Sequence, residues 1–106
     1  MVTAEQIRQG KIHAENAGQA MYQRVGERDA CGFGWVEVYV DRTNSKQAKE
    51  LIAAGFRKDY KPKCLSMWDP AGVPTQSISV KEAGAYAHAE YLTQLGLKAY
   101  AGSRLD

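Results

Sequence analysis

The chain has 106 residues, a length that predicts a single domain. Hydrophobic residues make up 44% and charged residues 25%, as in ordinary globular proteins, and no apolar run reaches the roughly 18 residues of a membrane span. The net charge is +2, but it is unevenly distributed: residues 42–63 hold seven Lys or Arg against two acidic residues. The middle of the chain is therefore electropositive, and this asymmetry affects which partners the protein can bind.

The N-terminus has no basic segment followed by an apolar one, so we expect no secretory signal and a cytoplasmic location. Cys31 and Cys64 are the only cysteines, and because they form no CxxC we expect free thiols rather than a disulfide. Together with His13 and His88 they match no zinc spacing. The sequence therefore predicts neither a metal site nor a cofactor.

Residues 3–25 predict a helix. Thr3 and Gln6 have capping-box spacing, in which each side chain satisfies a free backbone N–H of the first turn. Gly10 and Gly18 each weaken a helix by about 1 kcal/mol relative to alanine. Because the apolar stripe is thin, we expect this helix to depend on packing, with a break near one of the glycines or a protruding end.

Residues 31–40, CGFGWVEVYV, predict the central strand, because β-branched and aromatic residues alternate along it. One face is expected to pack against helices in the core. The other face combines aromatic rings with a carboxylate, and we expect a helix, a second subunit or a ligand to lie against it. The core face holds Val36, Val38 and Val40, and the other face holds Phe33, Trp35, Glu37 and Tyr39.

A second helix is predicted to begin at a capping box formed by Asn44 and Gln47 and to end at Gly55. The basic segment 56–63, FRKDYKPK, is polar and contains a proline, so we interpret it as a long loop or an irregular strand start. Residues 64–68 predict a strand.

Residues 69–72, Asp-Pro-Ala-Gly, have the composition of a type I turn, and a short returning strand is predicted at 76–79. A third helix is predicted at 80–95, capped by a serine and a glutamate, and a last strand at 97–101. The inner face of the third helix is predicted to hold Val80, Ala83, Gly84, Ala87, Tyr91 and Leu95.

From residue 33 the predicted order is strand, helix, strand, strand, helix, strand. This order predicts an α+β, ferredoxin-like (split βαβ) fold: a four-stranded antiparallel sheet with two helices on one face, plus an extra N-terminal helix. The chain is expected to be a single domain, 1–106, in which 1–26 is the N-terminal helix, 31–102 the βαββαβ core and 103–106 a tail.

The open face of such a sheet gathers both tryptophans, and so large an apolar patch usually marks an interaction site. Three explanations stay open: cover by the N-terminal helix, a homodimer, or stacking of nucleic-acid bases. The basic segment 56–63 favours nucleic acid, although a solvated loop is the ordinary interpretation of such a segment. The strand at 76–79 lacks the aromatic residue that a nucleic-acid surface needs. The face is predicted to contain Phe33, Trp35, Glu37, Tyr39, Cys64, Ser66, Trp68, Lys98 and Tyr100.

Signals for catalysis are weak. Cys31 has no histidine placed near it to lower its pKa, so we expect a buried, inert cysteine at a strand start. Glu37 is the one carboxylate whose pKa we expect burial to raise. The alternative interpretation of Glu37 is an ion pair with Lys98 across the sheet. His88 is expected in the core or at its boundary. We therefore predict no catalytic residue.

Three stretches, DACGFGWVEV, TQSISVKEAGAYAHAEYL and GLKAYAGSRLD, resemble a family of small hypothetical proteins encoded by tailed bacteriophages. The resemblance covers about the last three-quarters of the chain. It implies expression in the cytoplasm of an infected bacterium and an accessory role, and it carries over no catalytic residue.

The sequence therefore favours a non-enzymatic phage accessory protein that binds a host protein or a nucleic acid, without membrane contact and with a homodimer as one arrangement. The alternative is a small nucleotide-binding or small-molecule-binding protein or enzyme that uses the sheet face around Trp35, Glu37 and Cys31. The predicted binding residues are Trp35, Glu37, Tyr39, Trp68, Lys98, Tyr100, Arg57, Lys58, Tyr60, Lys61 and Lys63.

Overall fold

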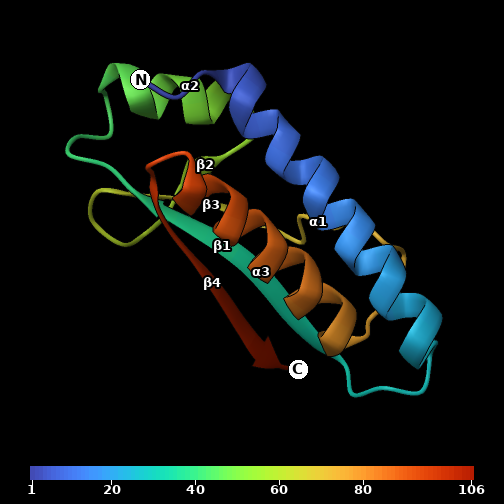
Figure 1. The fold of residues 1–106 in the computed structure, drawn as a ribbon. Helices are drawn as coiled ribbons and strands as arrows, with labels where there is room; N and C mark the ends of the chain where they lie inside the picture. The colour runs from blue at the N-terminus through green and yellow to red at the C-terminus, as the bar shows by residue number, and fades with distance from the viewer.

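A computed structural model describes residues 1–106 as three helices and one four-stranded antiparallel sheet, which confirms the α+β class (Figure 1). The strand order is β2-β3-β1-β4. None of the helices has the length and apolar character needed to cross a membrane. The elements are α1 (Ala4–Val25), β1 (Gly32–Tyr39), α2 (Lys46–Ala53), β2 (Arg57–Lys58), β3 (Cys64–Trp68), α3 (Ile78–Gln94) and β4 (Lys98–Leu105).

Strand β1 lies at the centre of the sheet and has the two faces that its alternation predicts. Val36 and Val38 are fully buried and belong to one apolar cluster with Leu51 of α2 and with Ala85 and Leu92 of α3. Helix α3 lies across β1 and β4 (Figure 1). The predicted packing of the third helix on the valine face is therefore confirmed.

Helix α1 begins at the predicted capping box and runs unbroken for 22 residues. Its glycines are contact points rather than breaks: a Cβ at Gly10 would lie 2.5 Å from the ring of His88, and one at Gly18 would lie 2.6 Å from Cβ of Ala71. The helix packs along α3 and touches α2, but it contacts no strand. Cover of the open sheet face by the N-terminal helix, one of the three explanations, is therefore wrong.

The predicted strand at 76–79 is also wrong. Ser77 is the N-cap of α3, which begins one residue later, and this segment forms only an isolated bridge, from Ser77 to Cys31 just before β1. The carboxylate of Asp29 accepts hydrogen bonds from the Ser77 hydroxyl and the Ser79 N–H, and these bonds lower its pKa to about 2. This local capping orders the segment as a helix start, and β2 supplies the remaining strand of the sheet.

Three smaller boundaries differ from the prediction. Ser45 rather than Asn44 caps α2, since its hydroxyl accepts from the N–H of Ala48. The last strand continues to Leu105, through residues that were expected to form a tail. The buried face of α3 differs from the predicted one, because small residues occur on every side of this helix and its sequence does not show which side is apolar. The buried residues are Val80, Gly84, Ala85, His88, Ala89 and Leu92.

His88 is completely buried beside Gly10 of α1, with its ring edge-on to Phe56 at 5.7 Å between centroids. Burial favours the neutral imidazole and, with the nearby charge of Lys11, lowers the pKa of His88 from 6.5 to about 4. The predicted core position of this histidine is confirmed.

The contact between α1 and α3 predicts that Gly10→Ala destabilises the protein, although alanine is the better helix former. The added Cβ meets the His88 ring, which has no space to move, so we expect a loss of about 1–3 kcal/mol in the free energy of unfolding. Denaturant unfolding measures it. Gln9→Ala, at the adjacent exposed position, is the matched control and should change stability by less than about 0.5 kcal/mol. A Gly10→Ala variant more stable than the parent would contradict this packing.

The buried imidazole predicts that stability falls as pH drops from about 6.5 to about 4. In that window the unfolded chain binds a proton at His88 and the folded chain does not, so acid favours unfolding, by roughly 3 kcal/mol over the whole window. Unfolding followed at several pH values measures this slope. In His88→Leu the part of the slope due to this residue should vanish, and an unchanged slope would show that other groups cause it.

Candidate binding site on the open face of the sheet

The strand register gathers on one face of the sheet the side chains that point away from the helices, and we call this surface the aromatic face. Residues directly opposite in antiparallel strands share a face. Trp35 lies opposite Trp68 of β3 and Gly102 of β4, and Glu37 lies opposite Ser66 and Tyr100. The aromatic face consists of Phe33, Trp35, Glu37, Tyr39, Arg57, Cys64, Ser66, Trp68, Lys98, Tyr100, Gly102 and Arg104.

The two tryptophans form the centre of this surface. Their rings are stacked, with centroids 4.7 Å apart and planes inclined by 24°, and Phe33 meets Trp68 edge-on at 6.1 Å. Gly102 makes the arrangement possible, since a Cβ there would lie 2.4 Å from the Trp35 indole. Trp68 keeps 51% of its surface exposed. The structure therefore presents a stacked aromatic pair to solvent.

Glu37 links the side chains of this surface through hydrogen bonds. Its carboxylate accepts hydrogen bonds from Trp35 Nε1 (3.0 Å), Tyr39 Oη (3.2 Å) and Lys61 Nζ (2.7 Å). Burial by itself raises the pKa of Glu37, but the bonds from Lys61 and Trp35 outweigh it and leave the pKa below its usual value. Both sequence expectations, a raised pKa and an ion pair with Lys98, are therefore wrong. An ionised carboxylate with three donors positions side chains and is poorly suited to proton transfer.

The loop between β2 and β3 bends over one side of the aromatic face. Asp59 accepts from the N–H of Lys61 and starts the turn, and Lys61 then reaches Glu37. The loop and the tryptophans enclose an open hollow of about 380 Å³, a volume within the range of small-ligand sites. The hollow is lined by Trp35, Glu37, Asp59, Tyr60, Lys61, Trp68 and Arg104.

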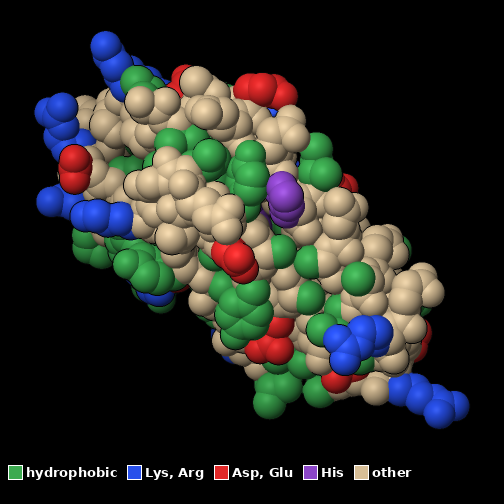
Figure 2. All heavy atoms as spheres, viewed as in Figure 1, with side chains coloured by type: hydrophobic (Ala, Val, Ile, Leu, Met, Phe, Trp, Pro, Cys, Tyr) green, Lys and Arg blue, Asp and Glu red, His purple; other side chains and the backbone are tan.

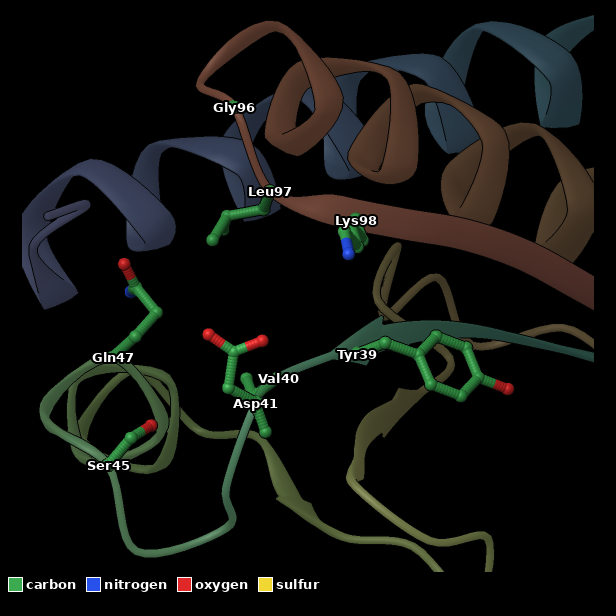
Figure 3. Close-up of a pocket in the computed structure, with 8 residues that line it drawn as sticks. All are labelled: Tyr39, Val40, Asp41, Ser45, Gln47, Gly96, Leu97 and Lys98. Atoms are coloured by element: carbon green, nitrogen blue, oxygen red, sulfur yellow. The ribbon is translucent and has the colours of Figure 1, made fainter.

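A second hollow, of about 320 Å³, lies where β1 leads to α2 and α3 leads to β4 (Figure 3). The carboxylate of Asp41 points into it. Its other polar groups serve the fold: Ser45 caps α2, and the amide of Gln47 bonds both backbone groups of Val2. Tyr39 and Lys98 also line this second hollow, but only the hollow on the aromatic face contains the two tryptophans and the exposed ring of Tyr60.

Most of the predicted binding residues meet at this site, and a few do not. Lys58 lies opposite Leu65, which is buried in the core, so it points to the other face of the sheet. Lys63 is exposed at the start of β3, outside the hollow. Arg104 was missed because the strand was expected to end at Ala101; the continued alternation after that residue was the available signal.

Cys31 lies at the end of the sheet and is exposed rather than buried, which corrects the expectation for this residue. The other cysteine, Cys64, is buried, and burial raises the pKa of its thiol. Both are free thiols. Cys31 does not line the hollow on the aromatic face, so the structure gives it no part in this site.

Positive charge gathers at one end of the molecule. Figure 2 shows Lys and Arg side chains grouped where α2 and the loop between β2 and β3 lie. On the aromatic face and its hollow the cations are Arg57, Lys61, Lys98 and Arg104, and the carboxylates are Glu37, which pairs with Lys61, and Asp59. The surface around the tryptophans is therefore electropositive.

Comparison with protein-family models, with curated proteins and with solved structures finds no match for this chain.

The hydrogen bonds of Glu37 predict that its pKa depends on Lys61 and not on Lys98. In Lys61→Met the pKa of Glu37 should rise, because its shortest hydrogen bond and its ion pair are lost while burial remains. Carbon-13 NMR titration of the carboxyl group measures it. Lys98→Met is the control and should leave the pKa nearly unchanged, since Lys98 makes no ion pair with Glu37. An equal rise in both variants would contradict the observed partner.

Proposed function

We propose that this protein is a non-enzymatic binding protein whose aromatic face takes up single-stranded nucleic acid. The observation that carries the proposal is the exposed Trp35–Trp68 stack on an electropositive sheet. Aromatic side chains on a sheet stack bases, and each base has a face to stack whatever its identity. The hollow beside the stack has room for a base between Trp68 and the loop that carries Tyr60.

The surrounding charges support a polyanion over a host protein as the partner. Arg57, Lys98 and Arg104 make no ion pair, so they are free to meet phosphates. Tyr60 is 91% exposed beside Lys61 and adds a further ring at the rim. A protein partner of ordinary composition would have to supply carboxylates opposite each of these cations, whereas a nucleic-acid strand carries regularly spaced phosphates.

We further propose that β1 to β4, with α2 and α3, form a ferredoxin-like core. The chain order from β1 is strand, helix, strand, strand, helix, strand, and the sheet order β2-β3-β1-β4 supports this proposal. It also removes the sequence-based objection to nucleic acid. The strand beside β1 is β3, which carries Trp68, rather than a strand at 76–79 without an aromatic residue.

The proposed setting is the one implied by the resemblance to phage proteins, an accessory role in the cytoplasm of an infected bacterium. Neither the phage origin nor the compartment follows from the fold, and both remain predictions. The proposal against catalysis rests on the saturated, ionised Glu37, which offers no free general base on this face.

Binding of short single-stranded oligonucleotides, followed by quenching of tryptophan fluorescence, tests the proposal. Trp68→Ala should weaken binding by about 1–3 kcal/mol, the usual value of one stacked base, and Trp68→Phe should recover part of it. Ile12→Ala, a similarly exposed apolar residue on α1, is the control and should bind like the parent.

Salt dependence separates phosphate contacts from other contacts. The logarithm of the binding constant should fall linearly with the logarithm of salt concentration, and Arg57→Ala should reduce that slope by about 1. Arg24→Ala, on the exposed end of α1, should not change it. Absence of oligonucleotide binding at low salt would overturn the proposal and favour a protein or small-molecule ligand.

A further inference from the structure

Strand β4 forms one margin of the sheet, and β1 is its only strand neighbour. Figure 1 shows α3 over this strand and no element on its outer side. The strand has eight residues and no proline. Natural sheets usually shorten, interrupt or cover such an edge, because its unpaired N–H and C=O groups can pair with another chain. A long open edge therefore suggests a partner strand.

The hydrogen bonds of β1 show which groups of β4 point away from β1. The N–H of Asp69 donates to the C=O of Gly34 (2.8 Å) and the N–H of Val40 donates to the C=O of Lys63 (2.9 Å), so these residues of β1 face β3. The alternate residues of β1 then face β4, where they pair with Lys98, Tyr100, Gly102 and Arg104. The β4 residues whose N–H and C=O groups point outward are Ala99, Ala101, Ser103 and Leu105.

Helix α3 borders this free edge with an exposed aromatic residue. Ser103 Oγ donates to Glu82 (2.6 Å), and Thr93 Oγ1 donates to the C=O of Ala99 (3.3 Å), so one stripe of the helix runs along the edge. Tyr86 lies on the same stripe between these two contacts and is 58% exposed. Figure 2 shows hydrophobic side chains along this margin of the molecule.

We propose that the chain forms a homodimer in which β4 pairs antiparallel with β4 of a second copy, with the two-fold axis passing at Gly102. In this register the outward-facing residues meet one another, so Ala101 pairs with Ser103 and Ala99 with Leu105 of the second copy, and every free N–H finds a C=O. The edge is thus complementary to itself.

The side chains on the aromatic face select this register. With the axis at Gly102, Lys98 lies opposite Asp106 of the second copy and Tyr100 lies opposite Arg104, which gives an ion pair and a cation–π contact on each side of the axis. Moving the axis to Ala101 would bring Lys98 against Arg104, two like charges. Moving it to Ser103 would place Tyr100 opposite Asp106 and Gly102 opposite Arg104, which gives neither the ion pair nor the cation–π contact.

The dimer would extend the sheet to eight strands and join two aromatic faces on the same side, because an axis perpendicular to the sheet keeps each face in place. On the other side the Tyr86 residues of the two copies would approach across the axis. The interface uses the edge of β4 and forms without nucleic acid, so the dimer and the proposed function are tested by separate measurements. In the dimer Lys98 and Arg104 would contact the second copy, and Arg57 would stay free for phosphates.

Sedimentation equilibrium of the protein without nucleic acid tests the dimer. The parent chain should show a monomer–dimer equilibrium, and Ala101→Pro should raise the dissociation constant by at least about tenfold, since each copy loses an outward N–H that β1 does not use. Circular dichroism checks that the variant is folded. A parent chain that stays monomeric at its highest soluble concentration, or a folded Ala101→Pro variant that dimerises like the parent, would overturn the proposal.

Charge reversal tests the register even if proline disrupts the strand. Lys98→Glu and Asp106→Lys should each weaken the dimer at low salt, because like charges then meet across the axis, and the double variant should restore it. Lys49→Glu on α2 is the control for Lys98→Glu, with the same change in net charge and no expected effect on assembly. If the double variant is as weak as the single ones, the register is wrong.

Discussion

Helix α1 lies against α3 because glycines at both contact points remove the side-chain bulk that would hold two helices apart. Gly10 receives the ring of His88, and Gly18 receives Ala71. Without these glycines the apolar stripe of α1 could not pack closely on α3. It would then have to pack on another apolar surface, and the open face of the sheet is the other one available. The close approach of two helices thus decides which face of the sheet stays open.

An open face with this many rings needs internal order, and Glu37 provides it. A partly buried carboxylate between Trp35 and Tyr39 would be costly if it had no hydrogen-bond donor or cation beside it. The loop after β2 supplies Lys61, so one ion pair neutralises the carboxylate of Glu37 on β1 and also holds the loop in place. The wall of the hollow and the orientation of the rings therefore depend on one set of hydrogen bonds.

The sequence predicts the parts of this structure that local periodicity and capping determine. The two faces of β1, the capping box of α1 and the turn at 69–72 follow from neighbouring residues alone. The missed features are those in which distant residues decide: Asp29 caps α3 from 48 residues away and removes the strand expected there. Similarly, nothing local distinguishes Lys61 from Lys98 as the partner of Glu37, so the sequence predicts the open face on which Glu37 lies but the wrong ion pair.

The indole of Trp35 is held from several sides in the free protein. Gly102 lies against one surface of the ring, Trp68 lies beside it, and its N–H is bonded to Glu37. A side chain fixed in this way has already lost its rotational freedom during folding, as part of the entropy that folding costs. A ligand that stacks beside it would lose less free energy to the ordering of side chains than it would on a flexible surface, so even modest contacts can give measurable affinity.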